Sequence, residues 1–235
     1  MRCRALTEER RRCPEVAVDE SGYCARHSDG TTRKNGNGAK PTRWGGILSL
    51  LRNTGPTPIP DGGKYDVPSW MKDAPTLHVI DHLQTNPESM TRWLAAFVLR
   101  KRRAVDAFEA LWTTLQSDPT RFVRQQAAVA LGKIGTPEVI APLVEGLNHD
   151  ADQGVRQACA VALGNLGIAS ATDEIVRVLE REENIFVRWD CVIALGQLGD
   201  RRVEDLLLRL QREEIAQVVR DACRDSLAEI RGRVA

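Results

Sequence analysis

Apolar and polar residues follow a helical period from about residue 74 onward, and the whole pattern recurs every 32 residues. Each unit contains two apolar segments at helical spacing. In one unit the first segment spans residues 106–116, with Phe108, Leu111 and Leu115 on one face, and the second spans residues 122–134. Gly135 then provides a stop signal that suits a left-handed helix end. The pattern predicts helix–turn–helix units with short connections.

A Val-Arg pair marks the same place in four successive units: Val123-Arg124, Val155-Arg156, Val187-Arg188 and Val219-Arg220. A degraded first unit has Thr91-Arg92 at this place. Units that repeat so regularly bury their apolar faces by stacking on one another. We therefore predict an all-α fold, a right-handed α-solenoid of about five helix pairs over residues 74–235. Charged residues in segment 220–227 predict a polar end cap.

The Val-Arg pair, the Ala-rich run behind it and the Leu-Gly-x-Leu/Ile-Gly ending resemble the HEAT-like repeats first associated with phycobilisome lyases. The resemblance covers about two-thirds of the chain and implies the fold. Members of this group include chromophore lyases, a di-iron lysine hydroxylase, DNA glycosylase relatives and adaptors. The hydroxylases take their iron ligands from His-Glu dipeptides, and because this sequence contains none, that activity is not expected.

The six cysteines fall into two groups. Cys159, Cys191 and Cys223 recur at the repeat interval, which predicts small buried residues between units. Cys3, Cys13 and Cys24 precede His27 in the pattern C-x9-C-x10-C-x2-H. Three thiolates and one imidazole are typical ligands of tetrahedral zinc, and four protein ligands leave no position for substrate. We predict a structural zinc module over residues 1–30, with a disordered basic tail or disulfides as alternatives.

This segment also resembles a small Cys3His zinc module that occurs at the ends of assorted proteins. Residues 31–73 follow as a predicted flexible linker, rich in Gly and polar residues, with a short apolar motif at 44–51. The motif is expected either to cover the open end of the first unit or to dock on a partner. Trp70 and Met71 are expected to begin the cap of the solenoid.

Composition is that of an ordinary globular chain, with 28% charged and 42% hydrophobic residues. No apolar stretch has the length of a membrane span and no signal peptide is evident, so we expect a cytoplasmic protein without a membrane partner. Charge is asymmetric, because residues 1–105 carry 18 Lys/Arg against 11 Asp/Glu and residues 106–235 carry 15 against 21. Possible nucleic-acid contacts are Arg10, Arg11, Arg12, Arg33, Lys34, Arg100, Lys101, Arg102 and Arg103.

Each repeated arginine follows an acidic position by six residues; the acids are Asp118, Asp150, Glu182 and Glu214. This spacing predicts an ion pair inside each unit. The first unit has Asn86 at the acidic position, so Arg92 is expected to be the least constrained. The residues that follow the arginines vary, which predicts a partner-binding strip in the inner groove: Trp93, Gln125, Gln157 and Trp189. Alternatively, the two tryptophans pack against the adjoining unit.

Motifs for catalysis are weak. His78 and His82 are one helical turn apart, but a third metal ligand is missing from the pattern, and ordinary surface residues are the simpler interpretation. The sequence has no phosphate-cradling glycine loop and no recognisable nucleophile motif. We therefore predict a non-catalytic adaptor that binds a protein partner in the groove, with the zinc module as a second contact. The alternatives are a nucleic-acid-binding or ribosome-associated factor and, third, a chromophore lyase or its chaperone.

Overall fold

The computed structural model describes residues 67–232, which belong to a unit formed by residues 59–235. All regular structure in this described part is helical. The candidate zinc ligands Cys3, Cys13, Cys24 and His27, and the apolar motif at 44–51, lie outside the described residues. The zinc module and the role of the motif therefore stay predictions.

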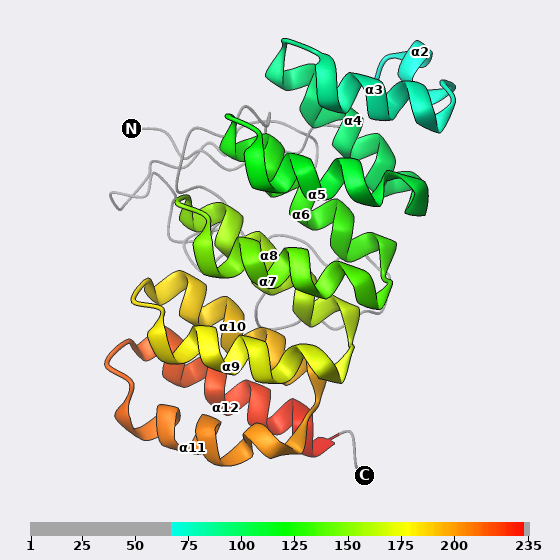
Figure 1. The fold of residues 1–235 in the computed structure, drawn as a ribbon. Coiled ribbons are helices and arrows are strands. Elements are labelled where there is room, and N and C mark those ends of the chain that lie inside the picture. Colours follow the sequence, from blue (N-terminus) through cyan, green and yellow to red (C-terminus); the bar gives the residue numbers. More distant parts are fainter. Residues whose placement is uncertain (1–66, 233–235) are drawn as a thin grey trace, which may run out of the picture. The chain divides into compact units, whose positions relative to one another are not determined.

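Five helix pairs follow one another along the chain, which confirms the predicted α-solenoid (Figure 1). The first helices of the pairs are α3 (Thr76–Thr85), α5 (Phe108–Ser117), α7 (Ile140–His149), α9 (Thr172–Arg181) and α11 (Glu204–Glu213). The second helices are α4 (Ser89–Arg102), α6 (Arg121–Ile134), α8 (Gln153–Leu166), α10 (Ile185–Leu198) and α12 (Gln217–Gly232). Short 3-10 turns lead into the first helices after α3: η1 (Val105–Ala107), η2 (Pro137–Val139), η3 (Ala169–Ala171) and η4 (Arg201–Val203).

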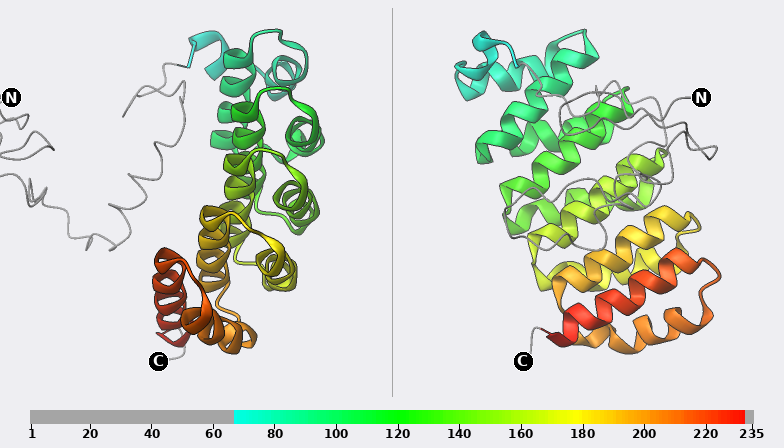
Figure 2. Two further views of the ribbon diagram at one scale, coloured as in Figure 1. Left: turned by 90° about the vertical axis from the view of Figure 1, so that its left-hand side faces the viewer. Right: turned by 180° about the vertical axis from the view of Figure 1, so that it is seen from behind.

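The helices form two layers, which Figure 2 shows edge-on. The second helices pack closely side by side, whereas each first helix packs mainly on the second helices and touches its own neighbours lightly. The core lies between the layers, where Leu111 and Leu115 of α5 and Leu131 of α6 are at most 2% exposed. Burial of these apolar stripes, repeated in each unit, supplies most of the stability.

Glycines allow the second helices to approach closely. A Cβ atom added to Gly132 would lie 2.7 Å from Ala162 Cβ, and one added to Gly164 would lie 2.7 Å from Ala194 Cα. Small residues fill the rest of the contact, including the free cysteines Cys159, Cys191 and Cys223, which are buried as predicted. Burial raises the pKa of all three thiols, so they remain protonated and act as small apolar side chains.

The second helices end in a left-handed residue in four units. Gly135, Gly167 and Gly199 have φ of 80°, 66° and 71°, which confirms the predicted glycine stop signal. In the first unit Arg103 takes this position with φ of 50°. A side chain in this region of φ carries a small strain that glycine avoids.

Both ends of the solenoid are capped. At the first end the short helix α2 (Ser69–Lys72) buries Met71 completely, and Arg102 donates hydrogen bonds to the carbonyls of Met71 (3.2 Å) and Lys72 (2.7 Å). At the last end Arg224 of α12 is exposed, although earlier units bury Ala96, Ala128, Ala160 or Val192 at this position. Both caps agree with the prediction.

The repeated arginines form a ladder between units, so the predicted pairing inside each unit is wrong. Arg124 donates from Nε and Nη2 to the Asp150 carboxylate of the next unit at 2.7 and 2.9 Å. Its Nη1 donates to the carbonyl of Asp118 in its own unit at 2.9 Å. The Asp118 carboxylate is instead bonded by Arg92 of the preceding unit, at 2.7 and 3.0 Å. Each arginine therefore ties its own turn to the turn of the next unit.

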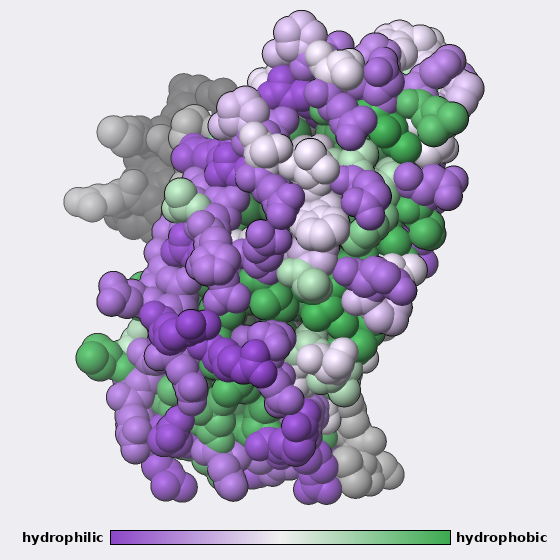
Figure 3. All heavy atoms as spheres, viewed as in Figure 1, coloured by the Kyte–Doolittle hydropathy of each residue, from purple (hydrophilic) through white to green (hydrophobic). Residues whose placement is uncertain are grey.

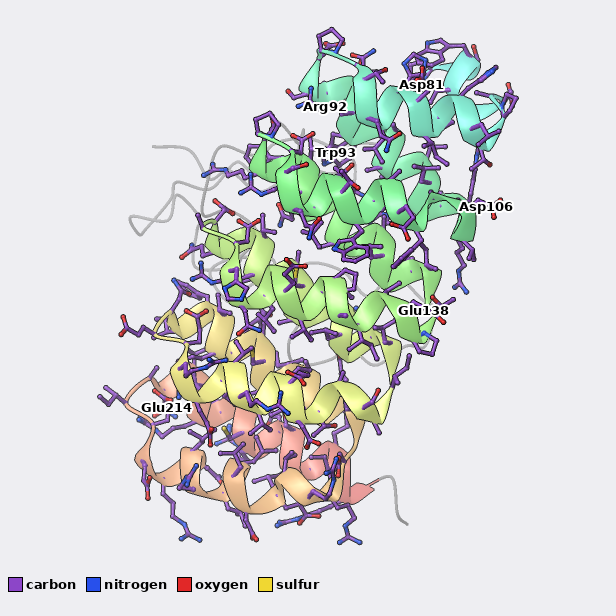
Figure 4. The ribbon with its side chains drawn as sticks, in the orientation of Figure 1. Asp81, Arg92, Trp93, Asp106, Glu138 and Glu214 are labelled. Atoms are coloured by element: carbon purple, nitrogen blue, oxygen red, sulfur yellow. The ribbon has the colours of Figure 1, made fainter. Side chains whose placement is uncertain are left out.

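The same arrangement continues along the solenoid, with Arg156 bonded to Glu182 and Arg188 bonded to Glu214. Figure 4 shows Arg92 and Glu214 on the edge where the two helices of each unit are joined. Arg92 is 9% exposed and fully engaged, so the expectation that it is the least constrained is wrong. The least constrained of the repeated arginines is Arg220 of the last unit. Within residues 67–232 it donates to backbone carbonyls and to Gln217 but to no carboxylate.

We expect Gly164→Ala to destabilise the solenoid by about 1–3 kcal/mol, because the added methyl group would press on the backbone of Ala194. The matched control is Gly232→Ala, whose added methyl group meets nothing within 4 Å. Urea denaturation followed by circular dichroism measures both. Equal midpoints for the two variants would contradict the close approach of α8 and α10.

We expect Arg124→Met to lower the free energy of unfolding by about 3 kcal/mol, because it leaves the largely buried Asp150 carboxylate without its cation. Replacing both partners, as Arg124→Met with Asp150→Leu, should cost clearly less than the single change. The control Arg177→Met removes an exposed pair with Glu174 and should cost less than about 0.5 kcal/mol. If Arg124→Met were as mild as the control, the ladder would have no part in joining the units.

Candidate functional site

The second helices present a continuous surface on the side away from the first helices. In α4, Ala95 and Leu99 are fully buried toward the core. Two residues correspond to about 200° around a helix, so positions 97 and 101 lie on the opposite side. The same positions recur in each later second helix. We call this surface the second-helix face; Figure 2 shows the layer that carries it.

Three rows of residues cross the second-helix face, one residue from each second helix. The first row is Trp93, Gln125, Gln157, Trp189 and Asp221. The second row is Phe97, Val129, Val161, Ile193 and Asp225. The third row is Lys101, Lys133, Asn165, Gln197 and Glu229. Positions four residues apart share one side of a helix, so the rows lie side by side.

The first row is the strip that the sequence predicted as partner-binding, and its tryptophans are buried. Trp189 is 1% exposed and Trp93 is 8% exposed, while Gln125 and Gln157 are half-buried. Trp93 stacks on Phe97 with ring centroids 5.5 Å apart. The indoles are large enough to fill the space between neighbouring helices, so they pack within the layer. In this conformation the tryptophans do not offer the exposed anchors that the sequence suggested.

The second row is apolar in four successive units and remains accessible. Val161 is 38% exposed, and Phe97, Val129 and Ile193 are partly buried. Exposed apolar residues of the first helices do not recur in this way, because Leu77 of α3 is 74% exposed but its position in later units holds residues such as Glu109, Asp173 and Asp205. Apolar side chains that recur at one partly accessible position of successive units are typical of a surface that contacts another protein.

The third row changes charge along the solenoid. Lys101 and Lys133 are exposed on α4 and α6, neutral Asn165 and Gln197 follow, and Glu229 is exposed on α12. In the other two rows the α12 residue is also a carboxylate, Asp221 or Asp225. The face is therefore basic at the first unit, apolar and neutral in the middle, and acidic at the last unit.

A buried carboxylate lies just beneath this face. Asp190 of α10 is 4% exposed and accepts a hydrogen bond of 2.8 Å from Gln157 Nε2 of the preceding unit. Burial raises the pKa of Asp190 to about 7, and the bond from Gln157 only partly offsets this. The sequence did not single out Asp190, because other units have Leu94, Gln126, Ala158 or Ala222 at this position.

The basic cluster at the end of α4 has mixed roles. Arg100 and Lys101 lie over the ring of Phe97, with Arg100 Cζ and Lys101 Nζ at 4.7 and 5.5 Å from its centroid. Arg102 is engaged with α2, and Arg103 ends the helix in the exposed left-handed position. The other predicted nucleic-acid contacts, Arg10, Arg11, Arg12, Arg33 and Lys34, lie outside the described residues.

The first-helix layer has shallow hollows. Two adjoining ones, of about 170 and 330 Å³, lie between α9 and α11 and are open to solvent. Both hollows are lined by Glu180, Leu206 and Arg209. Figure 3, seen from this side, shows polar ridges with apolar side chains between them. Small-molecule sites usually enclose most of their ligand, and these open hollows do not.

Metal ligands are not gathered in the described part of the chain. Residues 67–232 contain no group of three or more His, Cys, Asp or Glu placed to hold a metal ion. His82 contacts the Trp70 ring, with centroids 4.8 Å apart, and lies beside Asn86, so the surface interpretation of His78 and His82 fits better than a metal site. No described helix is both long and apolar enough to cross a membrane.

Comparison with known proteins identifies the repeat. A family model described as HEAT repeats matches residues 76–164 and 140–228. The complex of CpcE and CpcF of phycocyanin lyase from Nostoc sp. is similar in structure, with a TM-score of 0.58 and 21% identity over 74% of this chain and 70% of that chain. At this identity the likeness shows the fold alone. Comparison with curated protein sequences gives no match.

Two other solved structures are more distant. An engineered protein matches with a TM-score of 0.45 and 20% identity over 69% of this chain and 86% of its own. Human deoxyhypusine hydroxylase in complex with glycerol matches with a TM-score of 0.42 and 21% identity over 67% of this chain and 74% of its own.

We expect the stability of the protein to depend on pH through Asp190. Its folded-state pKa of about 7 lies above the ordinary value of 3.8, so the folded state holds a proton that the unfolded chain releases. This contribution is complete below about pH 4 and is lost as the pH rises to about 7. Asp190→Asn keeps an acceptor for Gln157 and carries no charge. The variant should exceed the wild type in stability at pH 8 by about 4 kcal/mol and lose most of this advantage at pH 4.

Urea denaturation at pH 4, 6 and 8 measures the difference between the two proteins. Asp205→Asn, at an exposed position on α11, is the matched control and should show no such pH-dependent difference. A constant difference between wild type and Asp190→Asn at all three pH values would mean that the Asp190 carboxyl titrates normally.

Proposed function

The chain belongs to the family of HEAT-repeat proteins, and we propose that it is a non-catalytic scaffold that binds a protein partner along the second-helix face. The accessible apolar row Phe97, Val129, Val161 and Ile193 is the observation that carries the proposal. Four units each place an apolar side chain at the same position, and each side chain stays partly accessible to solvent. Contact with a partner removes this apolar surface from water.

The neutral middle of the face favours protein over nucleic acid as its ligand. A nucleic-acid strand needs cations along its whole path, since the phosphates supply most of the affinity. Here the cations of the three rows are confined to α4 and α6, and the carboxylates of α12 would repel a phosphate backbone. The nucleic-acid alternative therefore depends on the basic residues before position 67, and not on the second-helix face.

A chromophore lyase or its chaperone is the third candidate, and the fold-level likeness to the phycocyanin lyase complex keeps it open. Against a catalytic role, the one buried carboxylate with a raised pKa among residues 67–232 is Asp190, which is 4% exposed and hydrogen-bonded to Gln157. A group so covered has little access to a substrate. Genes for bilin-bearing proteins beside this gene would favour the lyase.

The N-terminal residues extend the proposal. Cys3, Cys13, Cys24 and His27 would hold a structural zinc ion, whose binding would supply the folding energy of a segment too short for its own core. Tethered to the solenoid, such a module would offer a second contact and raise the apparent affinity for a shared partner.

We expect Val161→Glu to reduce retention of the partner by at least about tenfold, because it places a charge in the middle of the apolar row. The measurement is a pull-down with the tagged full chain from cells of the source organism, with and without nuclease. Val161→Ala, a milder change, should weaken binding less and keep the fold. Thr113→Glu adds the same charge at an exposed position of α5 and should leave binding unchanged.

Two results would refute the proposal. One is undiminished retention by Val161→Glu when circular dichroism shows a folded protein. The other is loss of all bound material after nuclease treatment, which would favour the nucleic-acid alternative. Deletion of residues 1–52 would then test whether the basic N-terminal part is the binding end.

A further inference from the structure

The charge on the second-helix face is ordered, and this order restricts the partner. Lys101 and Lys133 lie at one end of the face, and Asp225 and Glu229 lie at the other. Packed helices are about 8–10 Å apart, so the two ends are separated by about 30 Å, several times the screening length at physiological salt. Each end therefore acts on its own part of a partner.

The acidic end is more than a solvent-exposed cap. Arg224 pairs with Asp221 at 2.8 Å and lies 3.6 Å from Asp225, so part of the negative charge is compensated within α12. Even without Glu229, the two carboxylates of Asp221 and Asp225 share one guanidinium, and that guanidinium replaces residues that earlier units bury against the next helix. The face itself keeps a net negative charge at this end.

The apolar row has the spacing of a helix that crosses it. Neighbouring second helices place Phe97, Val129, Val161 and Ile193 at intervals of about 8–10 Å. An α-helix rises about 1.5 Å per residue, so its residues i and i+7 lie about 10 Å apart on one side. A partner helix with an apolar side chain at every seventh position would meet all four members of the row, in the mode by which amphipathic helices enter apolar grooves.

Resting on the proposed function, we infer that the partner presents an amphipathic helix that is acidic at the end seated over α4 and α6 and basic at the end seated over α12. Arg100 and Lys101, held over the Phe97 ring, meet the acidic end beside the first apolar contact. The neutral Asn165 and Gln197 adjoin the middle of the helix, where no charge is required. Opposite charges at the two ends fix the position of the helix and increase its association rate.

The test uses the full chain and a displayed library of helical peptides of about 35 residues, enough to span all five second helices. Leu is fixed at four positions seven residues apart, and the remaining positions vary among Ala, Gln, Glu and Lys. Selected peptides should gather Glu around one terminal Leu and Lys in the segment beyond the other terminal Leu. A synthetic peptide of a selected sequence should bind at least about tenfold more tightly than a peptide of the same composition with Glu and Lys evenly mixed.

Two charge-reversed proteins with equal net charge make the comparison specific. The double variant Lys101→Glu, Lys133→Glu should bind the selected peptide at least about tenfold more weakly than the wild type does. Arg209→Glu with Arg212→Glu, on the first-helix layer, is the matched control and should change binding less than about twofold. Thermal midpoints of all proteins are recorded, so that loss of binding is not loss of fold.

The outcomes separate the inference from the proposed function. Peptides that require Val161 but show no order of charge would overturn the inference and leave the proposed function standing. Peptides that bind the Val161→Glu variant as well as the wild type would overturn both. Failure of the library to give any binder would overturn the inference, as would preferential binding of a single-stranded oligonucleotide that is lost in the Lys101→Glu, Lys133→Glu protein.

Discussion

Each arginine of the ladder is shared between two turns, and this sharing fixes how one helix pair is placed on the next. Arg124 holds the carbonyl of Asp118 in its own unit and the carboxylate of Asp150 in the following unit. Asp150 in turn accepts a hydrogen bond of 2.8 Å from the amide of Asp152. A largely buried ion pair adds little net stability, because desolvation offsets most of its attraction. Its directional bonds instead select one arrangement of the two turns among those that apolar packing alone would permit.

Alignment of the units has a direct consequence for the surface. Since each unit is joined to the next by the same contacts, residues 32 positions apart lie at corresponding places on neighbouring second helices. The glycine contacts reinforce this, because Gly164 meets the backbone of α10 at a single place and a sliding of the helices would bring larger side chains there. Four separate apolar side chains thus become one continuous strip, as extended binding by a solenoid requires.

Periodicity predicted the helices well and the contacts between units poorly. The predicted helical segment at 122–134 differs from α6 by one residue at its start. The prediction that Gly135 ends this helix in a left-handed conformation is also confirmed. The arginine ladder shows why the contacts between units were predicted poorly. Asp118 lies six residues before Arg124 of its own unit and 26 residues after Arg92 of the preceding unit, and the two intervals add up to the 32-residue repeat. In a regular repeat every arginine has one acidic residue six positions before it and another 26 positions after it. The sequence therefore cannot tell whether the guanidinium binds the carboxylate of its own unit or that of the next unit.

The candidate site was found in part for a related reason. A row of varied residues, such as the one that contains Trp93 and Trp189, shows that a position is not held constant by the core, but not how far a side chain extends from it. The indoles turn into the space between helices and are buried, whereas the shorter Val129 and Val161 remain accessible. The ordered charges were visible in the sequence, yet they became a surface property only when the helices showed that Lys101 and Glu229 share one row.

The carboxylates of α12 distinguish a binding role from the needs of an end cap. A terminal unit must be polar where earlier units are covered by the next helix, and Arg224 meets that need at the position of buried Val192. Asp225 occupies a different position, which is at least partly exposed in every unit and is apolar in the four units before it. Capping does not require a change there, and a charge of either sign would serve solubility equally well. A negative charge opposite Lys101 and Lys133 is instead what recognition of a partner with two oppositely charged ends requires.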